Sequence, residues 1–334
     1  MREVLGGRRG KICQVDSGGL RGLTSAPASI SLAPILRPIK FALLVVLAVA
    51  CSPRHYALEK VADAVSQSGE GGAFARDDDP ELIRDAVPFA LKTMESLADK
   101  LPDDANLRLG LARGFTQYAY GFVQQPAELR ESPDVAEVLR ARKLYLRARQ
   151  YGLDGLKIKR GITEQQLGVE KDREAALARL TKEDVPLVYW TLVPWAAAIA
   201  ADKRDIALVG DLPIVAAMLD RALALDDAYD RGALHEFSIT FDPARPEGTT
   251  PEKQKAHFDR AMALANGTKI SPLVTYAQSV AASAQDKKQY VSLLQAAVSF
   301  DVDKPEARND RLANVLSQRR AKYLLDHLDD VFSD

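Results

Sequence analysis

A seven-residue pattern that recurs in the C-terminal half restricts the possible folds more than any other feature of the sequence. Leu219-Asp-Arg-Ala-Leu-Ala-Leu225 returns 39 residues later as Phe258-Asp-Arg-Ala-Met-Ala-Leu264, and more weakly 36 residues after that as Leu294-Gln-Ala-Ala-Val-Ser-Phe300. Each copy closes an expected helix and is followed by a polar turn and another helix. Helix pairs that recur every roughly 30–40 residues are typical of an α-solenoid. The alternative is a chance similarity between helices rich in Ala and Leu.

The chain beyond residue 55 has the composition of helices throughout. Ala, Leu, Arg, Glu and Asp are frequent there, and runs of β-branched residues are scarce. Asp79 before Pro80 and Asp184 near the start of an apolar run are expected to cap helices, whereas Pro126 and Gly161 are expected to end them. The predicted fold is therefore all-α. We expect helices over residues 55–66, 80–101, 105–125, 134–159, 163–180 (in short pieces), 188–203, 205–226, 228–241, 251–265, 272–284, 286–300 and 305–332.

An export signal precedes the helical region. The basic flank Arg37-Pro-Ile-Lys40 is followed by the apolar run Phe41–Ala50, which is too short to cross a bilayer as a stable helix. Cys51 comes directly after the small residues that end this run. That order resembles the bacterial lipoprotein signal, in which the cysteine is acylated and becomes the first residue of the mature protein. We therefore predict a covalent lipid on Cys51 and no other cofactor. An ordinary signal peptide with an incidental cysteine and an inner-membrane stub are the alternatives.

These features divide the chain into three parts. Residues 1–50 are a leader with the lipoprotein signal, residues 51–76 hold the lipidated cysteine, a short helix and a linker, and residues 77–334 are the helical-repeat domain. Residues 1–36 are rich in Gly, Ser and Arg, and they make the leader unusually long. Our hypothesis is that the start codon was assigned too far upstream and that the protein begins near Leu36.

The charge of the exported part argues against one class of partner. Seven of the 45 Lys and Arg residues and two of the 46 Asp and Glu residues lie in residues 1–50, so residues 51–334 carry 38 bases and 44 acids. Nucleic acid is not an expected partner of this acidic chain, because phosphate binding needs a basic face. The two cysteines are Cys13, in the leader, and Cys51, so we expect no disulfide in the exported part.

The sequence shows no residues with the spacing of a catalytic or metal site. His235-Glu236 begins like the zinc-protease motif H-E-x-x-H, but Ile239 stands where the second histidine ligand would be. The four histidines lie far apart, and no cysteine joins them. Asp77–Asp79 lacks the alternating spacing of a calcium-binding loop. We therefore predict a protein that is not an enzyme and holds no metal.

The aromatic segment at residues 113–124 is the best candidate for a recognition surface. On a helix, Phe115 and Phe122 share one apolar face, which we expect to belong to the core. Gln117 and Tyr120 lie on a second, amphipathic face. Amide and phenol groups beside an aromatic ring suit either the lining of a groove or a polar contact between helices. We assign the following residues to a groove that binds a partner or a ligand: Gln117, Tyr120, Gln124, Tyr189, His235 and Glu236.

Several longer segments resemble one protein family over almost all of residues 51–332. They are FARDDDPELIRDAVPFALKTME (74–95), LARGFTQYAYGFVQ (111–124), ARKLYLRARQYGLDGL (141–156), YWTLVPWAAAI (189–199), LDRALALDDAYDRGALHEF (219–237), HFDRAMALANG (257–267) and LANVLSQRRAKYLL (312–325). Together with the signal at Cys51, they make the chain similar to the T component (TatT) of tripartite ATP-independent periplasmic (TRAP) transporters.

This resemblance implies an all-helical fold of tetratricopeptide-like pairs, a lipid anchor, exposure to the periplasm, a homotrimer and association with the solute-binding (P) subunit. The family has no established catalytic residues, and its groove or pore is described as accepting a hydrophobic ligand or the partner protein.

We therefore predict that the chain is a lipid-anchored accessory protein of a TRAP-type system and that it docks the solute-binding subunit through a helical-repeat groove or pore. The alternative is a periplasmic carrier that holds an apolar small molecule in an aromatic-lined pocket. Ser52 follows Cys51 and is not the aspartate that retains enteric lipoproteins in the inner membrane. We therefore favour the outer membrane over the inner one.

Overall fold

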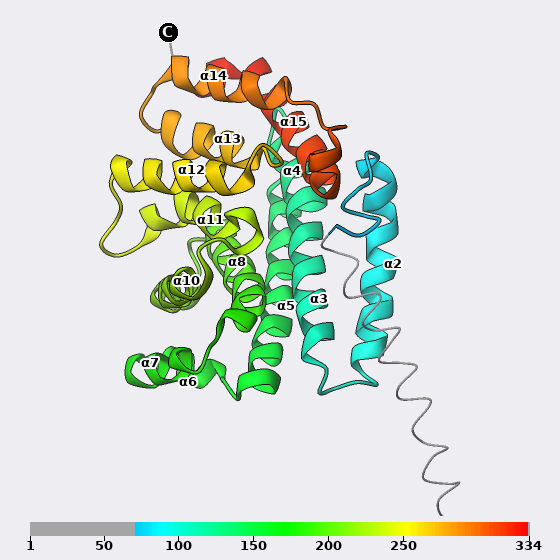
Figure 1. The fold of residues 1–334 in the computed structure, drawn as a ribbon, viewed down its shortest axis with the longest axis vertical. Helices are drawn as coiled ribbons and strands as arrows, with labels where there is room; N and C mark the ends of the chain where they lie inside the picture. The colour runs from blue at the N-terminus through cyan, green and yellow to red at the C-terminus, as the bar shows by residue number, and fades with distance from the viewer. Residues whose placement is uncertain (1–70, 333–334) are drawn as a thin grey trace, which may run out of the picture. The chain divides into compact units, whose positions relative to one another are not determined.

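The computed structural model describes residues 71–332, and these residues form helices and turns without a β-strand (Figure 1). The chain divides into two units, Met1–Pro53 and Arg54–Asp334, and every described residue belongs to the second. The all-α prediction is confirmed for this part of the chain. The predictions for the leader, for the lipid on Cys51 and for a helix over residues 55–66 lie outside the described residues.

The helices follow the order expected from the sequence, with shorter pieces at several ends. The α-helices are α2 (Pro80–Ala98), α3 (Ala105–Tyr118), α4 (Gln125–Glu128), α5 (Val135–Arg160), α6 (Glu164–Gly168), α7 (Glu170–Ala178), α8 (Val185–Ala201), α9 (Ile206–Val209), α10 (Leu212–Asp226), α11 (Ala233–Phe241), α12 (Pro251–Ala265), α13 (Ser271–Tyr276), α14 (Lys287–Val298) and α15 (Arg311–Asp326). Two segments are π-helical, η2 (Ala119–Gln124) and η6 (Ala277–Ala281). The 3₁₀ turns are η3 (Lys182–Asp184), η4 (Tyr229–Arg231), η5 (Asp242–Ala244), η7 (Pro305–Asp310) and η8 (Leu328–Asp330).

Side-chain caps explain many of the helix starts. Asp79 accepts a hydrogen bond from the backbone N–H of Leu82 (3.0 Å), and Asp104 caps α3 in the same way. Gly161 ends α5 in the left-handed conformation, with φ 63°, as expected for a residue without a Cβ. These local signals fix where the chain turns, and tertiary packing then decides how the helices associate.

Two predictions about helix ends are corrected by the structure. Asp184 occupies the N-cap position of α8 as expected, but its side chain makes no capping hydrogen bond, because its carboxylate accepts hydrogen bonds from Thr181 and Arg160 instead. Pro126 does not end the second helix, because it lies in the first turn of α4, where the backbone changes from π-helical to α-helical. The helical path therefore continues from α3 through η2 and α4 as far as Glu128.

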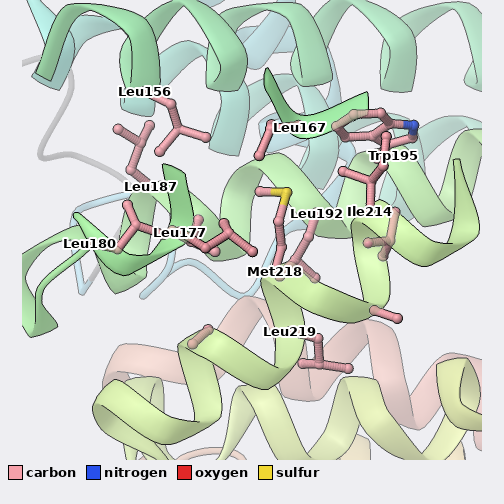
Figure 2. Close-up of a cluster of buried hydrophobic side chains, with 14 of the residues drawn as sticks. Leu156, Leu167, Leu177, Leu180, Leu187, Leu192, Trp195, Ile214, Met218 and Leu219 are labelled. Carbon is pink, nitrogen blue, oxygen red and sulfur yellow. The ribbon is translucent and has the colours of Figure 1, made fainter. Parts of the chain in front are cut away.

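The most tightly packed contact lies between α5 and α8. A Cβ on Gly152 would lie 2.3 Å from Thr191 Oγ1, and one on Gly155 would lie 2.8 Å from Leu187 Cδ1, so only glycine permits this approach. Side chains from α5, α6, α7, α8 and α10 close around this contact (Figure 2). The labelled members of this cluster are Leu156, Leu167, Leu177, Leu180, Leu187, Leu192, Trp195, Ile214, Met218 and Leu219.

Helix α8 is central, as its all-round apolar sequence predicts. It packs against α3, α5, α10 and α11, and Leu192 and Trp195 have no exposed surface. Within residues 71–332, Lys182–Ala201 is the stretch long and apolar enough to cross a membrane. Most of it is buried within the protein, and a buried core helix meets the same criteria of length and hydropathy.

The recurring seven-residue pattern falls in alternate helices. Its first two copies lie in α10 and α12, and the third begins in α14. The helices between them, α11 and α13, pack against α12 and α14 respectively, and α10 to α14 follow one another along one side of the described region (Figure 1). The alternation matches the expected helix pairs, while the regular superhelical geometry of a solenoid stays a prediction.

Candidate functional site

A cavity of about 1590 Å³ lies between α2, α3, η2, α8, α11 and α15. Its lining is more apolar than polar, and α8 contributes Tyr189, Trp190, Val193, Ala196 and Ala197 to it. Along α8 these residues are offset from Leu187, Thr191 and Trp195 of the tightly packed core, against which Tyr189, Val193 and Ala196 also pack in part. Ligand pockets usually measure about 300–1,000 Å³, so this cavity has room for a long molecule or for part of a partner protein.

The aromatic segment lines this cavity, but its backbone is not a regular α-helix. Between Ala119 and Gln124 it is π-helical, which widens the turn and shifts the later side chains away from a 3.6-residue period. Gln117 and Tyr120 border the cavity and are exposed, Tyr120 to 47%. Phe122 was expected to be plain core, yet it is only half-buried and also lines the cavity. π-Helical turns are frequent at functional sites, so this distortion marks the segment independently of its side chains.

Gln124 borders the cavity with both ends of its amide already in use. Its Oε1 accepts a hydrogen bond from the Tyr145 hydroxyl (2.6 Å), and its Nε2 donates to Glu128 (2.7 Å). Glu128 in turn accepts from Arg320 of α15 (3.3 Å), whose Nε also donates to Gln278 (2.7 Å). This chain of contacts ties η2 and α4 to α5 and α15, which gives Gln124 a structural role.

An aromatic cluster forms the α8 side of the cavity. Tyr189 meets Trp190 edge to face, with ring centroids 5.0 Å apart, and its ring lies 5.3 Å from that of Tyr229. Burial raises the pKa of Tyr189 well above its usual value, and the nearby negative charges of Glu236 and Asp230 raise it further, so its phenol stays neutral. The indole N–H of Trp190 is buried and finds no acceptor among the described residues.

Glu236 places a carboxylate in the wall of the same cavity. It lies deep in the protein yet keeps some accessible surface, because it borders the open space. Its oxygens accept hydrogen bonds from the Ser271 hydroxyl (2.9 Å) and the Thr275 hydroxyl (3.1 Å). Burial raises the pKa of Glu236, while these two hydrogen bonds and the charge of Lys269 oppose that rise.

A strained turn next to Glu236 presents further charges to the cavity. Asp230, Arg231 and Gly232 all have positive φ, at 40°, 53° and 94°. Two successive non-glycine residues in this region are unfavourable and persist only where surrounding contacts hold them. Lys269 provides one such contact, with its Nζ donating to Asp230 Oδ1 (2.8 Å) and to the Asp230 carbonyl (2.7 Å). Arg231 provides the other, through a two-pronged ion pair with Asp310.

Two histidines that the sequence separates lie in contact. The prediction that the histidines lie far apart is wrong for His235 and His257, whose Nδ1 atoms are 2.9 Å apart. Each Nε2 faces a carboxylate, Asp227 at 3.7 Å and Asp242 at 3.5 Å. Burial lowers the pKa of both imidazoles, and the charge of His257 lowers that of His235 further. Within residues 71–332 no three His, Cys, Asp or Glu side chains gather to hold a metal ion.

The structure brings most of the predicted groove residues to one place. The members that line the cavity are Gln117, Tyr120, Gln124, Tyr189 and Glu236. His235 precedes Glu236 on α11 but is not part of the cavity lining, and it pairs with His257 instead. Sequence reasoning did not single out Lys269 or Asp230, since a pair of residues 39 positions apart leaves no local pattern. Gly232 in the middle of an expected helix was the available signal for the strained turn.

Comparison with known proteins gives two matches. The family model described as TRAP transporter T-component matches residues 76–332. An uncharacterized protein of Treponema pallidum (strain Nichols) is 31% identical over 270 residues, which cover 78% of this chain and 83% of the relative.

Proposed function

Because this chain belongs to the TRAP transporter T-component family, we propose that it is a lipid-anchored periplasmic accessory protein that docks the solute-binding subunit at the mouth of its cavity. Membership of the family makes it an accessory component of a transport system. Docking at the mouth of the cavity needs no catalytic group, because this protein and the solute-binding subunit would bind each other through complementary surfaces.

The observation that carries this proposal is an exposed aromatic rim. Phe89 on α2 is 79% exposed and Tyr120 on η2 is 47% exposed, and both border the cavity. Exposed aromatic side chains beside a concavity are typical of protein-binding surfaces, because they supply large contact area at low entropic cost. Gln117, exposed on α3, adds an amide that can make directional hydrogen bonds to a partner.

A second function is favoured by the interior of the cavity. Its volume and its aromatic α8 wall suit a carrier of an apolar small molecule. The two functions are compatible if the docked subunit passes its ligand to the cavity or receives one from it. They differ in which residues matter, since docking depends on Phe89 and Tyr120 at the rim and carriage depends on Trp190 and Val193 inside.

The anchor and the assembly belong to the same proposal. Acyl chains on Cys51 would hold the protein at a membrane, because each buried methylene contributes about 0.8 kcal/mol. We favour the outer membrane over the inner one. Cys51→Ser should then leave the protein soluble or unprocessed in a membrane fractionation. A processed variant that stays membrane-bound would refute the anchor. The homotrimer implied by the family should sediment near three times the monomer mass, and a clean monomer would refute it.

The test of docking first asks whether a solute-binding subunit is encoded near this gene, and then uses that subunit as the partner. Both proteins are purified, mixed and separated by size-exclusion chromatography, and we expect them to elute together. Separate elution at concentrations of about 100 μM would exclude a docking function of useful affinity, since such a complex would be weaker than about −5.5 kcal/mol. Absence of any transporter gene nearby would also count against the proposal.

A further inference from the structure

Three acids and two bases of the cavity lining meet around the turn at Asp230, and the other charged lining residues are Arg113 on α3 and Lys203 after α8. The five residues around the turn are Asp230, Arg231, Glu236, Lys269 and Asp310. The two bases are already committed, Lys269 to Asp230 (2.8 Å) and Arg231 to Asp310 (2.7 Å). The surplus negative charge therefore belongs to Glu236.

Neutral groups supply the hydrogen bonds to Glu236, and Lys269, whose charge also favours the ionised carboxylate, is paired with Asp230. The hydrogen-bond donors to Glu236 are the hydroxyls of Ser271 and Thr275, and Glu236 forms no ion pair with any Lys or Arg of the described residues. A buried carboxylate is normally paired with a base, because transfer of an unpaired charge out of water is costly. Glu236 departs from that rule at a place where its carboxylate borders an open space. A cation that enters the cavity would complete the pair.

The walls around Glu236 suit a cation that carries an apolar body. Tyr189, Trp190 and Phe237 present aromatic rings to the same cavity, and aromatic faces attract ammonium groups. Further along α8, Val193 and Ala197 continue the lining without charge. An anionic head would instead meet the surplus negative charge of this end, at an electrostatic cost.

We propose that the cavity binds an amphipathic cation, with a protonated amine or a quaternary ammonium group paired with Glu236 and an apolar body along α8. This ligand class goes beyond the docking function and does not depend on it. The docking surface is the rim around Phe89 and Tyr120, whereas the cation site is at Glu236, beside the turn at Asp230. A protein that binds amines but no solute-binding subunit would overturn docking and leave this site intact.

The test compares four ligands with the same eight-carbon chain: octylamine, octyltrimethylammonium, 1-octanol and octanoate. Binding to the full-length protein is followed by tryptophan fluorescence at about pH 8, where an alkyl amine is still protonated. Trp190 lines the cavity, whereas Trp195 is fully buried elsewhere, so a signal change reports on Trp190. Far-UV circular dichroism confirms that each ligand leaves the fold intact.

We expect the two cations to bind more tightly than octanol, and octanoate to bind most weakly. Glu236→Gln keeps an acceptor for Ser271 and Thr275 but removes the charge, so it should weaken both cations by about tenfold or more and leave octanol unchanged. The matched control Glu174→Gln, on the exposed side of α7, should change nothing. Octanoate binding to the wild-type protein as tightly as octylamine would overturn the proposal, and so would an equal loss of octanol and octylamine in Glu236→Gln. The ligand order of the wild-type protein decides the matter even if the variant does not fold.

Discussion

The two sides of α8 follow opposite rules of packing. On the α5 side, Thr191 lies so close to Gly152 that no Cβ fits between them, and Trp195 is completely buried. On the other side, Tyr189 and Trp190 border a cavity large enough for a foreign molecule. The same helix therefore serves as scaffold on one side and as binding wall on the other, and the scaffold side fixes the position of the wall.

Two buried acids near α8, Asp184 at its start and Glu236 in the wall of the cavity, show a similar contrast. Asp184 has no exposed surface and is surrounded by partners, namely the backbone N–H of Thr181 (2.9 Å), Arg160 (2.7 Å) and Lys159 (2.9 Å). Burial alone would raise the pKa of Asp184, but these partners outweigh it and lower that pKa to about 2. Burial raises the pKa of Glu236, whose donors are neutral. A carboxylate paired with bases holds the fold together, whereas one that accepts hydrogen bonds from hydroxyls alone is available to pair with a ligand.

The largest expected contrast uses the two tryptophans of α8. Trp195→Ala should lower the free energy of unfolding by about 3–5 kcal/mol. It leaves a void in a filled core and removes the hydrogen bond that the indole N–H donates to Asp211 (3.1 Å). Trp190→Ala should cost at least about 1 kcal/mol less, since its indole N–H has no acceptor among residues 71–332 and the vacated space joins an existing cavity. Urea denaturation measures both. Equal losses would mean that the two sides of α8 do not differ.

A pair of glycine variants tests the close approach of α5 and α8. Gly152→Ala should destabilise the protein by about 1–3 kcal/mol despite the better helix propensity of alanine, because its Cβ would overlap Thr191. Gly168→Ala, which meets nothing within 4 Å, is the control and should be neutral or slightly stabilising. Thermal denaturation followed by circular dichroism compares them. A neutral Gly152→Ala would show that the helices are not in contact at this point.

Asp184→Asn should destabilise the protein by a smaller amount, about 1–2 kcal/mol, because Lys159 and Arg160 reach solvent and can be partly hydrated without it. The folded-state pKa of about 2 lies below the ordinary 3.8. The contribution of Asp184 is therefore present above about pH 4 and is lost as pH falls from about 4 to 2. Acid denaturation of the variant should lack that component, and a pH profile identical to wild type would show that Asp184 is not stabilising.

Glu236→Gln should have the smallest effect and the opposite sign. The raised folded-state pKa of Glu236 means that its ionised form is disfavoured in the native protein, so stability contributed by Glu236 is lost as pH rises above its ordinary value of 4.5. Removal of the charge should leave the urea midpoint at about pH 8 equal to or above that of the wild-type protein. A clear decrease would show that the carboxylate is a structural group like Asp184.

The sequence predicts the scaffold better than the site for identifiable reasons. Caps such as Asp79 and the stop at Gly161 are local signals, and the all-round apolar run of α8 predicts a central helix without knowledge of its neighbours. The π-helical turn in η2 depends on contacts with other helices, so a 3.6-residue period misplaced Phe122. Pro126 shows the same limit, because only the structure places it in a first helical turn.

The candidate site could be predicted in part from residue chemistry. Amphipathic residues such as Tyr120 and Tyr189 stood out by type, and the structure places both on one cavity. Contacts between distant parts of the chain carry no such signal. The pairing of Lys269 with Asp230 and the contact of His235 with His257 join residues 39 and 22 positions apart, and only the fold brings them together.

The most direct test of the docking function is the affinity of this protein for the purified solute-binding subunit, measured by isothermal titration calorimetry with rim variants. Phe89→Ala and Tyr120→Ala remove the exposed aromatic rim without emptying the core, so we expect each to weaken binding by about tenfold or more at unchanged helicity. Ile206→Ala is the matched control, because Ile206 is 76% exposed but lies away from the cavity lining, and it should bind like the wild-type protein. Wild-type affinity in both rim variants, or no binding by the unaltered protein, would contradict the account.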